Sequence, residues 1–152
     1  MRPDFGLGRS VDGGRALNLF AYIDGASLGN PGDAGYGVVI KSEDGTVMKS
    51  VGRFIGKATN NVAEYQGLMG CLSLIETFSV QSLTVYSDSL LLVNQMNGLY
   101  KVKQPHLQEL FRTIKETLQQ RSLRFRIVHI PREQNKEADR LASRAAETRS
   151  EI

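Results

Sequence analysis

The segment LNLFAYID, residues 17–24, constrains the fold most strongly, because it alternates and yet is apolar on both of its faces. One face carries Leu17, Leu19, Ala21 and Ile23, and the other carries Phe20 and Tyr22. A period of two residues predicts a β-strand, and two apolar faces are typical of a central strand covered on each side. The segment ends on Asp24, so a carboxylate stands where a buried strand is expected to end.

The rest of the chain continues this strand into a mixed sheet. A glycine-rich stretch, DGASLGNPG, leads to two strand-like runs around the turn EDG, which predicts three consecutive antiparallel strands. A helical pattern follows over residues 62–78, with Asn60 or Asn61 as its N-cap. Strands are then predicted at 82–88 and 123–130, and helices at 89–96, 104–120 and 131–147. The order β-β-β-α-β-α-α-β-α predicts an α/β fold, a five-stranded mixed sheet with helices on both faces.

Length and composition fit a globular domain. The chain has 152 residues, 41% of them hydrophobic, which is enough for a core. We assign residues 16–148 to one domain and the glycine-rich residues 1–15 to a flexible N-terminal arm. The single cysteine, Cys71, excludes an intrachain disulfide and favours a reducing, cytoplasmic location. No apolar run reaches the roughly 20 residues of a membrane helix, so we expect no membrane partner, and we expect a monomer.

Positive charge is concentrated in the C-terminal part of the chain. The formal net charge is only +3, but residues 101–144 contain eleven Lys and Arg against five Asp and Glu. Such a bias favours a polyanionic partner, and a solvated basic surface is the alternative interpretation.

Four carboxylates stand at special places in this pattern. Asp24 and Asp88 end predicted strands, Glu64 lies in the first turn of a predicted helix, and Asp139 lies on the last helix. Strand ends of such a sheet form its binding edge, where converging carboxylates would repel unless a cation joined them. Oxygen ligands suit Mg²⁺ or Mn²⁺. Helix caps and surface charges remain the alternative for each acid taken singly. A nucleotide-binding loop fits less well, because its glycines should lead into a helix rather than a second strand.

Four motifs resemble those of the type 1 ribonuclease H family. They are DGASLGNPG, TNNVAE, YSDS and REQNKEADRLA, which occur in the family's order and span most of the chain, from Asp24 to Ala142. The resemblance implies a ribonuclease H-like fold and an endonuclease that hydrolyses the RNA strand of RNA–DNA hybrids. It implies 5′-phosphate and 3′-hydroxyl products and two Mg²⁺ or Mn²⁺ ions per site, held by Asp24, Glu64, Asp88 and Asp139.

The same resemblance implies a set of substrate contacts. They are Gly25, Ala26, Ser27, Asn30, Thr59, Asn60, Asn61, Ser89 and Asn135. For Asn30 a plain turn residue is the competing interpretation, and for Asn60 and Asn61 it is helix capping. The partner implied is an RNA–DNA hybrid, with double-stranded RNA as a further candidate.

The match is incomplete in two places. His129 precedes Asp139 by ten residues, where many family members have a mobile histidine that helps proton transfer, but here it sits in the apolar run RIVHI. We include it as a candidate catalytic residue, with a structural role as the alternative. The segment MNGLYKVKQPH is too short for the basic insertion of some relatives, so hybrid affinity is expected to come from elsewhere. DNA strand transfer on the same fold and a non-catalytic nucleic-acid-binding module are the competing functions.

Overall fold

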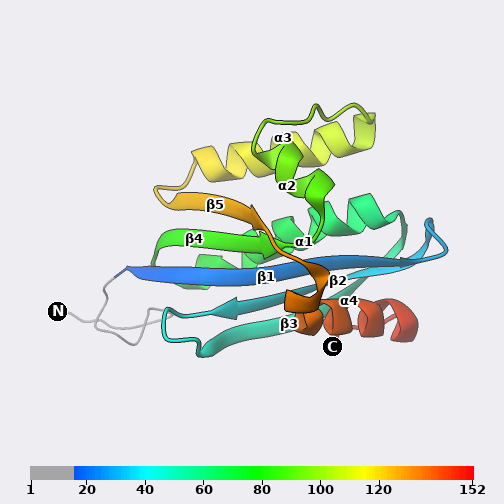
Figure 1. Ribbon diagram of the computed structural model, residues 1–152, viewed down its shortest axis with the longest axis horizontal. Helices are drawn as coiled ribbons and strands as arrows, with labels where there is room; N and C mark the ends of the chain where they lie inside the picture. Colours follow the sequence, from blue (N-terminus) through cyan, green and yellow to red (C-terminus); the bar gives the residue numbers. More distant parts are fainter. Residues whose placement is uncertain (1–15) are drawn as a thin grey trace.

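The computed structural model describes residues 16–152, which form a five-stranded sheet and four α-helices (Figure 1). The predicted N-terminal arm, residues 1–15, lies outside the described residues. The strands are β1 (Leu17–Leu28), β2 (Gly32–Lys41), β3 (Val47–Ala58), β4 (Val80–Ser87) and β5 (Arg124–His129). The helices are α1 (Asn60–Leu74), α2 (Leu90–Met96), α3 (Pro105–Gln119) and α4 (Lys136–Thr148), with short 3-10 turns η1 (Ile75–Thr77) and η2 (Arg132–Gln134).

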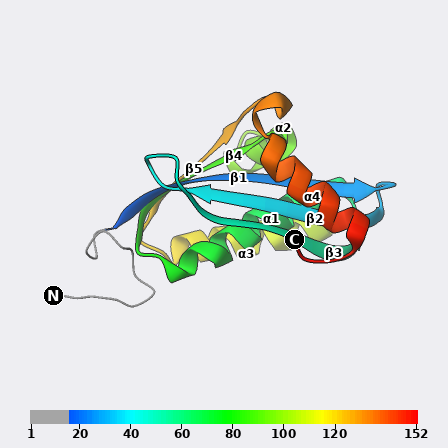
Figure 2. The same ribbon diagram turned by 90° about the horizontal axis from the view of Figure 1, so that it is seen from below.

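The sheet has the predicted mixed topology. Its strand order is β3-β2-β1-β4-β5, and β1 pairs antiparallel with β2 and parallel with β4. β2 pairs antiparallel with β3, and β4 pairs parallel with β5. Helices lie on both faces, with α1 and α3 on one side of the sheet and α4 on the other (Figure 2). The predicted fold class is confirmed.

The main core lies between the sheet and α1. Leu19, Ala21 and Ile23 of β1 are completely buried, as their shared face in the sequence predicts. α1 packs against this face with Leu68 and Cys71, both also completely buried. The cysteine is therefore a core residue, and burial raises the pKa of its thiol to about 12.

The second face of the sheet is covered only in part. α4 packs on β1, β2 and β3, where glycines allow a close approach: a Cβ atom at Gly37 would lie 2.2 Å from the carbonyl oxygen of Ala138. In Figure 1, which views the sheet from the α4 side, none of the described helices lies in front of β4 or β5. Phe20 and Tyr22 are therefore only half-buried, whereas their alternating pattern predicted full cover on both sides.

Several element boundaries differ from the prediction, among them the end of β1 and the cap of α1. β1 does not end at Asp24 but continues to Leu28, because β2 pairs with it over this whole length. The parallel pairing with β4 does stop at Ile23, so Asp24 still stands at the edge that β1 and β4 share. The cap of α1 is Thr59, whose hydroxyl accepts a hydrogen bond from the N–H of Val62 (3.2 Å), rather than Asn60 or Asn61.

Among residues 16–152, no helix is both long and apolar enough to cross a membrane.

Replacing Gly37 by alanine should destabilise the fold through the contact with α4. The added methyl group would overlap the Ala138 carbonyl oxygen, and a helix backbone cannot shift without disturbing its neighbours. We expect Gly37→Ala to lower the free energy of unfolding by about 1–3 kcal/mol in urea titrations followed by circular dichroism. Ser50→Ala, at an exposed position of β3, is the control and should change this free energy by less than about 0.5 kcal/mol. An unchanged midpoint for Gly37→Ala would contradict the close packing of α4.

Candidate active site

Three of the four predicted carboxylates converge in the folded chain. Asp24 projects from β1, Glu64 from the first turn of α1, and Asp88 directly follows the end of β4. One oxygen from each lies within 4.8 Å of the other two. The site therefore lies where the parallel pairing of β1 and β4 stops, at the edge of the sheet that the sequence predicts.

Gly25, which has no side chain, allows Asp24 and Glu64 to lie close together. Gly25 follows Asp24 on β1 and points toward α1, and a Cβ atom there would lie only 2.5 Å from the backbone nitrogen of Glu64. Only glycine lets the start of α1 lie this close to the strand. Because a larger residue would push the helix away, Gly25 sets the spacing between Asp24 and Glu64.

The fourth carboxylate, Asp139, joins from the opposite face. Asp24 is paired with Gly37, and directly opposed residues of an antiparallel pair point to the same side, here toward α4. Asp139 on α4 is close enough to Asp24 to raise the pKa of its carboxyl group. It lies on the exposed rim of the site and is not one of the three tightly clustered carboxylates.

The cluster stores electrostatic repulsion. Burial raises the pKa of Asp24 well above its usual range, and the charges of Glu64, Asp88 and Asp139 raise it further. The pKa of Glu64 is also raised, chiefly by burial and then by Asp88, while hydrogen bonds with Asp24 and the Gly25 backbone oppose the shift. Asp24 and Glu64 are 5% and 9% exposed, so water screens them poorly. These groups bind protons, or a cation in their place, more readily than isolated carboxylates do.

The donor set fits a hard divalent cation. The Oε1 atom of Glu64 is buried and has no hydrogen-bond partner, which is costly unless something else satisfies it. All the donors are carboxylate oxygens, which suit Mg²⁺ or Mn²⁺ rather than a softer metal. The positive charge of Arg132 in η2 lowers the pKa of Glu64. In the sequence, Arg132 is only one of the cations of residues 101–144.

The predicted substrate residues of the β1–β2 turn and the start of α1 lie together. Asn30 accepts a hydrogen bond on its side-chain oxygen from the N–H of Asn60 (2.9 Å). Ser27 donates its hydroxyl to the carbonyl oxygen of Ala58 (2.6 Å). Asn30 has a positive φ of 37°, next to Gly29 at 101°, so the turn depends on left-handed backbone here. Asn60 is exposed beside this link, and Asn61 and Ala26 are half-buried.

Two other predicted contact residues hold the framework of the site. Ser89 caps α2 by accepting a hydrogen bond from the N–H of Leu92 (3.2 Å), directly after Asp88. Asn135 is 1% exposed and donates its side-chain N–H to the carbonyl oxygen of Ile23 (2.8 Å). It therefore fastens the start of α4 to β1 one residue before Asp24, which makes it a positioning residue.

His129 lies beside the cluster in a strand rather than in a loop. It is the last residue of β5, is exposed, and pairs with Ser87, the residue before Asp88. The adjoining N–H of Ile130 donates to the carbonyl oxygen of Ser87 (3.0 Å), so the backbone here is held. The backbone of His129 therefore lies beside the residue that precedes Asp88, in a strand rather than in a loop.

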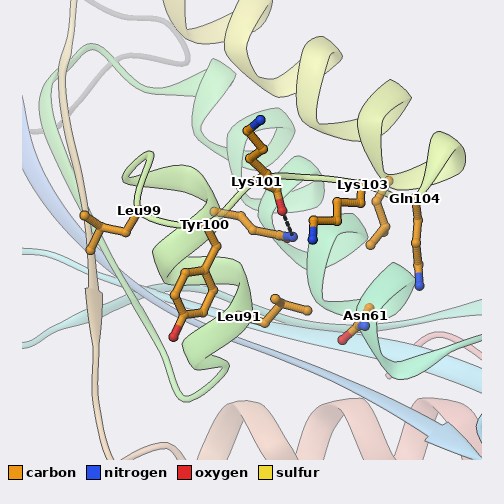
Figure 3. A pocket seen from close by; sticks show the side chains of 9 residues that line it. Asn61, Leu91, Leu99, Tyr100, Lys101, Lys103 and Gln104 are labelled. Atoms are coloured by element: carbon orange, nitrogen blue, oxygen red, sulfur yellow. Dashed lines mark hydrogen bonds between the residues drawn. The ribbon is translucent and has the colours of Figure 1, made fainter.

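A groove of about 540 Å³ extends from the start of α1 to the loop between α2 and α3 (Figure 3). Leu99 and Tyr100 lie on one side of it, and Asn61 and Gln104 on the other. Its other lining residues are Leu91, Gln95, Lys101, Lys103 and Leu107. Leu99 and Tyr100 are 72% and 49% exposed. Neighbouring apolar side chains that are this exposed to water often mark a binding surface. The short segment around Tyr100 was not expected to hold the hybrid, although an aromatic residue beside two lysines is typical of a nucleic-acid contact.

A three-strand meander followed by parallel strands, with carboxylates at the shared strand ends, defines a protein of the ribonuclease H-like class. A family model described as "Reverse transcriptase-like" matches residues 22–145. The ribonuclease HI of Halobacterium salinarum is 38% identical over 131 residues, which cover 86% of this chain and 65% of that protein. A bifunctional protein of Mycobacterium tuberculosis is 41% identical over 130 residues, which cover 85% of this chain and 35% of that protein.

The solved structures agree with these relatives. The crystal structure of LC11-RNase H1 in complex with an RNA/DNA hybrid matches with a TM-score of 0.82 and 40% identity, covering 86% of this chain and 98% of that one. The chain therefore belongs to the Reverse transcriptase-like family and, within it, to the type 1 ribonucleases H. It spans about a third of the mycobacterial relative and just under two thirds of the haloarchaeal one.

Removing one buried carboxylate should stabilise the metal-free protein. The fold raises the pKa of Asp24, so ionising this group opposes folding at every pH above the usual aspartate value of about 4. We expect Asp24→Asn to raise the free energy of unfolding by about 1–3 kcal/mol at pH 7 in EDTA. The gain should shrink as the pH falls toward about 4, where Asp24 is protonated in both states.

Urea titrations between pH 4 and pH 8 measure this effect. Glu116→Gln, on the exposed side of α3, is the matched control and should change stability little at either pH. A variant Asp24→Asn that is less stable than the parent protein at pH 7 would show that the cluster is not under electrostatic stress.

Proposed function

We propose that the chain is a metal-dependent endonuclease that hydrolyses the RNA strand of RNA–DNA hybrids, leaving 5′-phosphate and 3′-hydroxyl ends. The observation that carries this proposal is the convergence of Asp24, Glu64 and Asp88 within 4.8 Å, with one buried oxygen of Glu64 unpartnered. Relatives that are a ribonuclease HI and an RNase H1 bound to an RNA/DNA hybrid support the same reaction.

The four carboxylates would hold two Mg²⁺ or Mn²⁺ ions. When bound, these ions would activate a water molecule and neutralise charge on the leaving 3′ oxygen. Asp24 and Glu64 are buried and fixed by the Gly25 contact, so they keep their positions when substrate arrives. Asp139 lies on the exposed rim, where it meets solvent and substrate first.

Recognition of RNA would use the backbone of residues 25–27 and the start of α1. Gly25 lies against α1, so this backbone runs beside the Glu64 carboxylate. A 2′-hydroxyl group of the cut strand would find both donors and acceptors at this place, as expected for a shallow minor groove. Asn30, Thr59 and Asn60 would contact the neighbouring phosphates, since the Asn30–Asn60 hydrogen bond and the Thr59 cap place them together at the start of α1.

The groove of Figure 3 would take the uncut strand. The exposed ring of Tyr100 offers a stacking surface, and Lys101 and Lys103 offer cations for phosphates. Asn61 joins this groove to the start of α1, where Glu64 lies. A duplex held by both surfaces would present one strand to the carboxylates and the other to the groove.

His129 would serve as a proton shuttle at the exit of the site. It is exposed at the end of β5, on the strand next to the one that precedes Asp88, and an imidazole can pass a proton between a reacting group and solvent. Double-stranded RNA remains a second substrate candidate. Action as a monomer and a cytoplasmic location remain predictions of the sequence.

The proposed reaction predicts a specific pattern of cleavage. With Mg²⁺ or Mn²⁺, labelled RNA in an RNA–DNA hybrid should be cut internally, whereas double-stranded DNA should not be cut. Asp24→Asn should lower kcat by at least about 10³-fold, because it removes a central cation ligand and its charge. Gel analysis of all three duplexes, including double-stranded RNA, measures this, and EDTA should abolish cleavage.

Glu116→Gln, remote from the cluster, is the control and should keep the parent rate. Binding of the hybrid without cleavage at any Mg²⁺ or Mn²⁺ concentration would refute the proposal and favour a non-catalytic binding module. Joining of DNA ends instead of hydrolysis would favour strand transfer.

The groove predicts a salt-dependent loss of affinity. Lys101→Ala/Lys103→Ala should raise KM for the hybrid about tenfold at low salt with little change in kcat, because it removes phosphate contacts and not the reacting groups. The slope of log KM against log salt should become shallower by about 1–2. Arg112→Ala/Arg144→Ala removes the same charge from exposed sites on α3 and α4 and is the control. An unchanged KM would show that the groove does not hold substrate.

A further inference from the structure

The α4 side of the sheet has an uncovered half that plays no part in the proposed reaction. Side chains alternate along β1, so Phe20 and Tyr22 point to the same side as Asp24, the side on which Gly37 meets α4. α4 packs on β1, β2 and β3, and none of the described helices packs comparably over this side of β4 and β5. We call this surface the open sheet face. Its residues are Asn18, Phe20, Tyr22, Ser82, Thr84, Tyr86, Arg124 and Arg126, with Lys41 at its border.

Aromatic rings lie in the middle of the open sheet face. Tyr22 and Tyr86 are direct neighbours on β1 and β4, and their rings stack with centroids 5.0 Å apart. The Nζ atom of Lys41 lies 5.0 Å from the centroid of the Tyr22 ring. Phe20 comes next along β1, and all three rings are half-buried, so part of each remains accessible.

Cations border these rings. Arg124 and Arg126 are exposed on β5, and Arg126 stands across Thr84 from Phe20 in the strand register. Within residues 16–152 neither arginine makes an ion pair. The facing acids are Glu43, which accepts a hydrogen bond from Asn18 (3.2 Å), and Glu137, which Arg140 holds at 2.6 Å. The face therefore keeps an excess of positive charge.

Two hollows make room on this surface. One of about 630 Å³ is lined by Phe20, Thr84, Arg124 and Arg126, among others. The other, of about 500 Å³, is lined by Tyr22, Lys41 and Asn135. Asn135, which lines that second hollow, is 1% exposed, and its Oδ1 atom is buried without a hydrogen-bond partner. The two hollows adjoin along β1, because Phe20 and Tyr22 are successive residues on one face.

We propose that the open sheet face binds single-stranded nucleic acid. Unpaired bases expose their faces and can stack on Phe20, Tyr22 and Tyr86, while phosphates meet Lys41, Arg124 and Arg126. A duplex fits less well, since its bases already stack on one another. The segment that follows β5 passes between this face and the carboxylates, where Asn135 is fastened to Ile23. The surface is therefore separate from the proposed cleavage site and from the groove of Figure 3.

Binding of a fluorescein-labelled deoxythymidine oligonucleotide of 20 residues tests this proposal. Anisotropy is measured in EDTA at low salt with the full chain, so that metal and cleavage play no part. Arg124→Ala/Arg126→Ala should weaken binding about tenfold and make the slope of log K against log salt shallower by roughly 0.7 for each lost contact. Phe20→Leu, which keeps an apolar side chain but removes the ring, should weaken binding about fivefold or more.

Two control variants locate the effect. Arg112→Ala/Arg144→Ala removes the same charge elsewhere and should leave affinity within about twofold of the parent. Lys101→Ala/Lys103→Ala tests the groove in the same assay. Thermal unfolding by circular dichroism confirms that each variant is folded. The proposal is overturned if no oligonucleotide binds, which is the result expected of a surface that docks a protein. It is also overturned if only the groove variant, Lys101→Ala/Lys103→Ala, loses affinity.

Hybrid cleavage by the same variants is a separate readout. A protein that binds the oligonucleotide through Arg124 and Arg126 but cuts no hybrid would keep this inference and refute the proposed nuclease. If the protein cuts the hybrid but its affinity for the oligonucleotide is unchanged by the substitutions at Arg124, Arg126 and Phe20, the proposed function stands and this inference is refuted.

Discussion

The crowding of three carboxylates at one sheet edge is the constraint on which the rest of the structure depends. Asp24, Glu64 and Asp88 repel one another in a buried place where water screens poorly. A fold holds such a cluster only if each carboxylate is attached to a rigid element that cannot relax. Here Asp24 lies on the central strand β1, Glu64 at the start of α1 and Asp88 directly after β4. The hydrophobic core that packs behind these elements keeps the repelling carboxylates in place.

Close backbone contacts between the sheet and its helices keep these elements rigid. Gly25 lets α1 approach β1 at Glu64, and Gly37 lets α4 approach the other side of the sheet. Asn135 then fastens the start of α4 to β1 beside Asp24. These contacts depend on missing side chains and one buried amide. The site is therefore stabilised by packing around it, while the carboxylates themselves oppose folding.

Partial cover of the sheet links the fold to its surfaces. α4 is needed at the carboxyl ends of β1 and β4, where it brings Asp139 toward Asp24. Its remaining length lies over β2 and β3 and leaves β4 and β5 open on that side. A helix placed to complete a site thus leaves aromatic and basic side chains accessible elsewhere. The periodicity of residues 17–24 could not show this, since an apolar face looks alike under a helix and at a partly open surface.

The sequence by itself determined the order of elements and the acids that lie at the edge shared by β1 and β4. Periodicity and turn residues are local properties, so the topology, the buried face of β1 and the positions of Asp24 and Asp88 could be predicted. The N-cap at Thr59, the burial of Asn135 and the groove around Tyr100 could not. They depend on which segments meet, and only the tertiary structure decides that. Distances between segments follow from packing of the whole chain, which brings residues such as Ile23 and Asn135 together across more than a hundred positions.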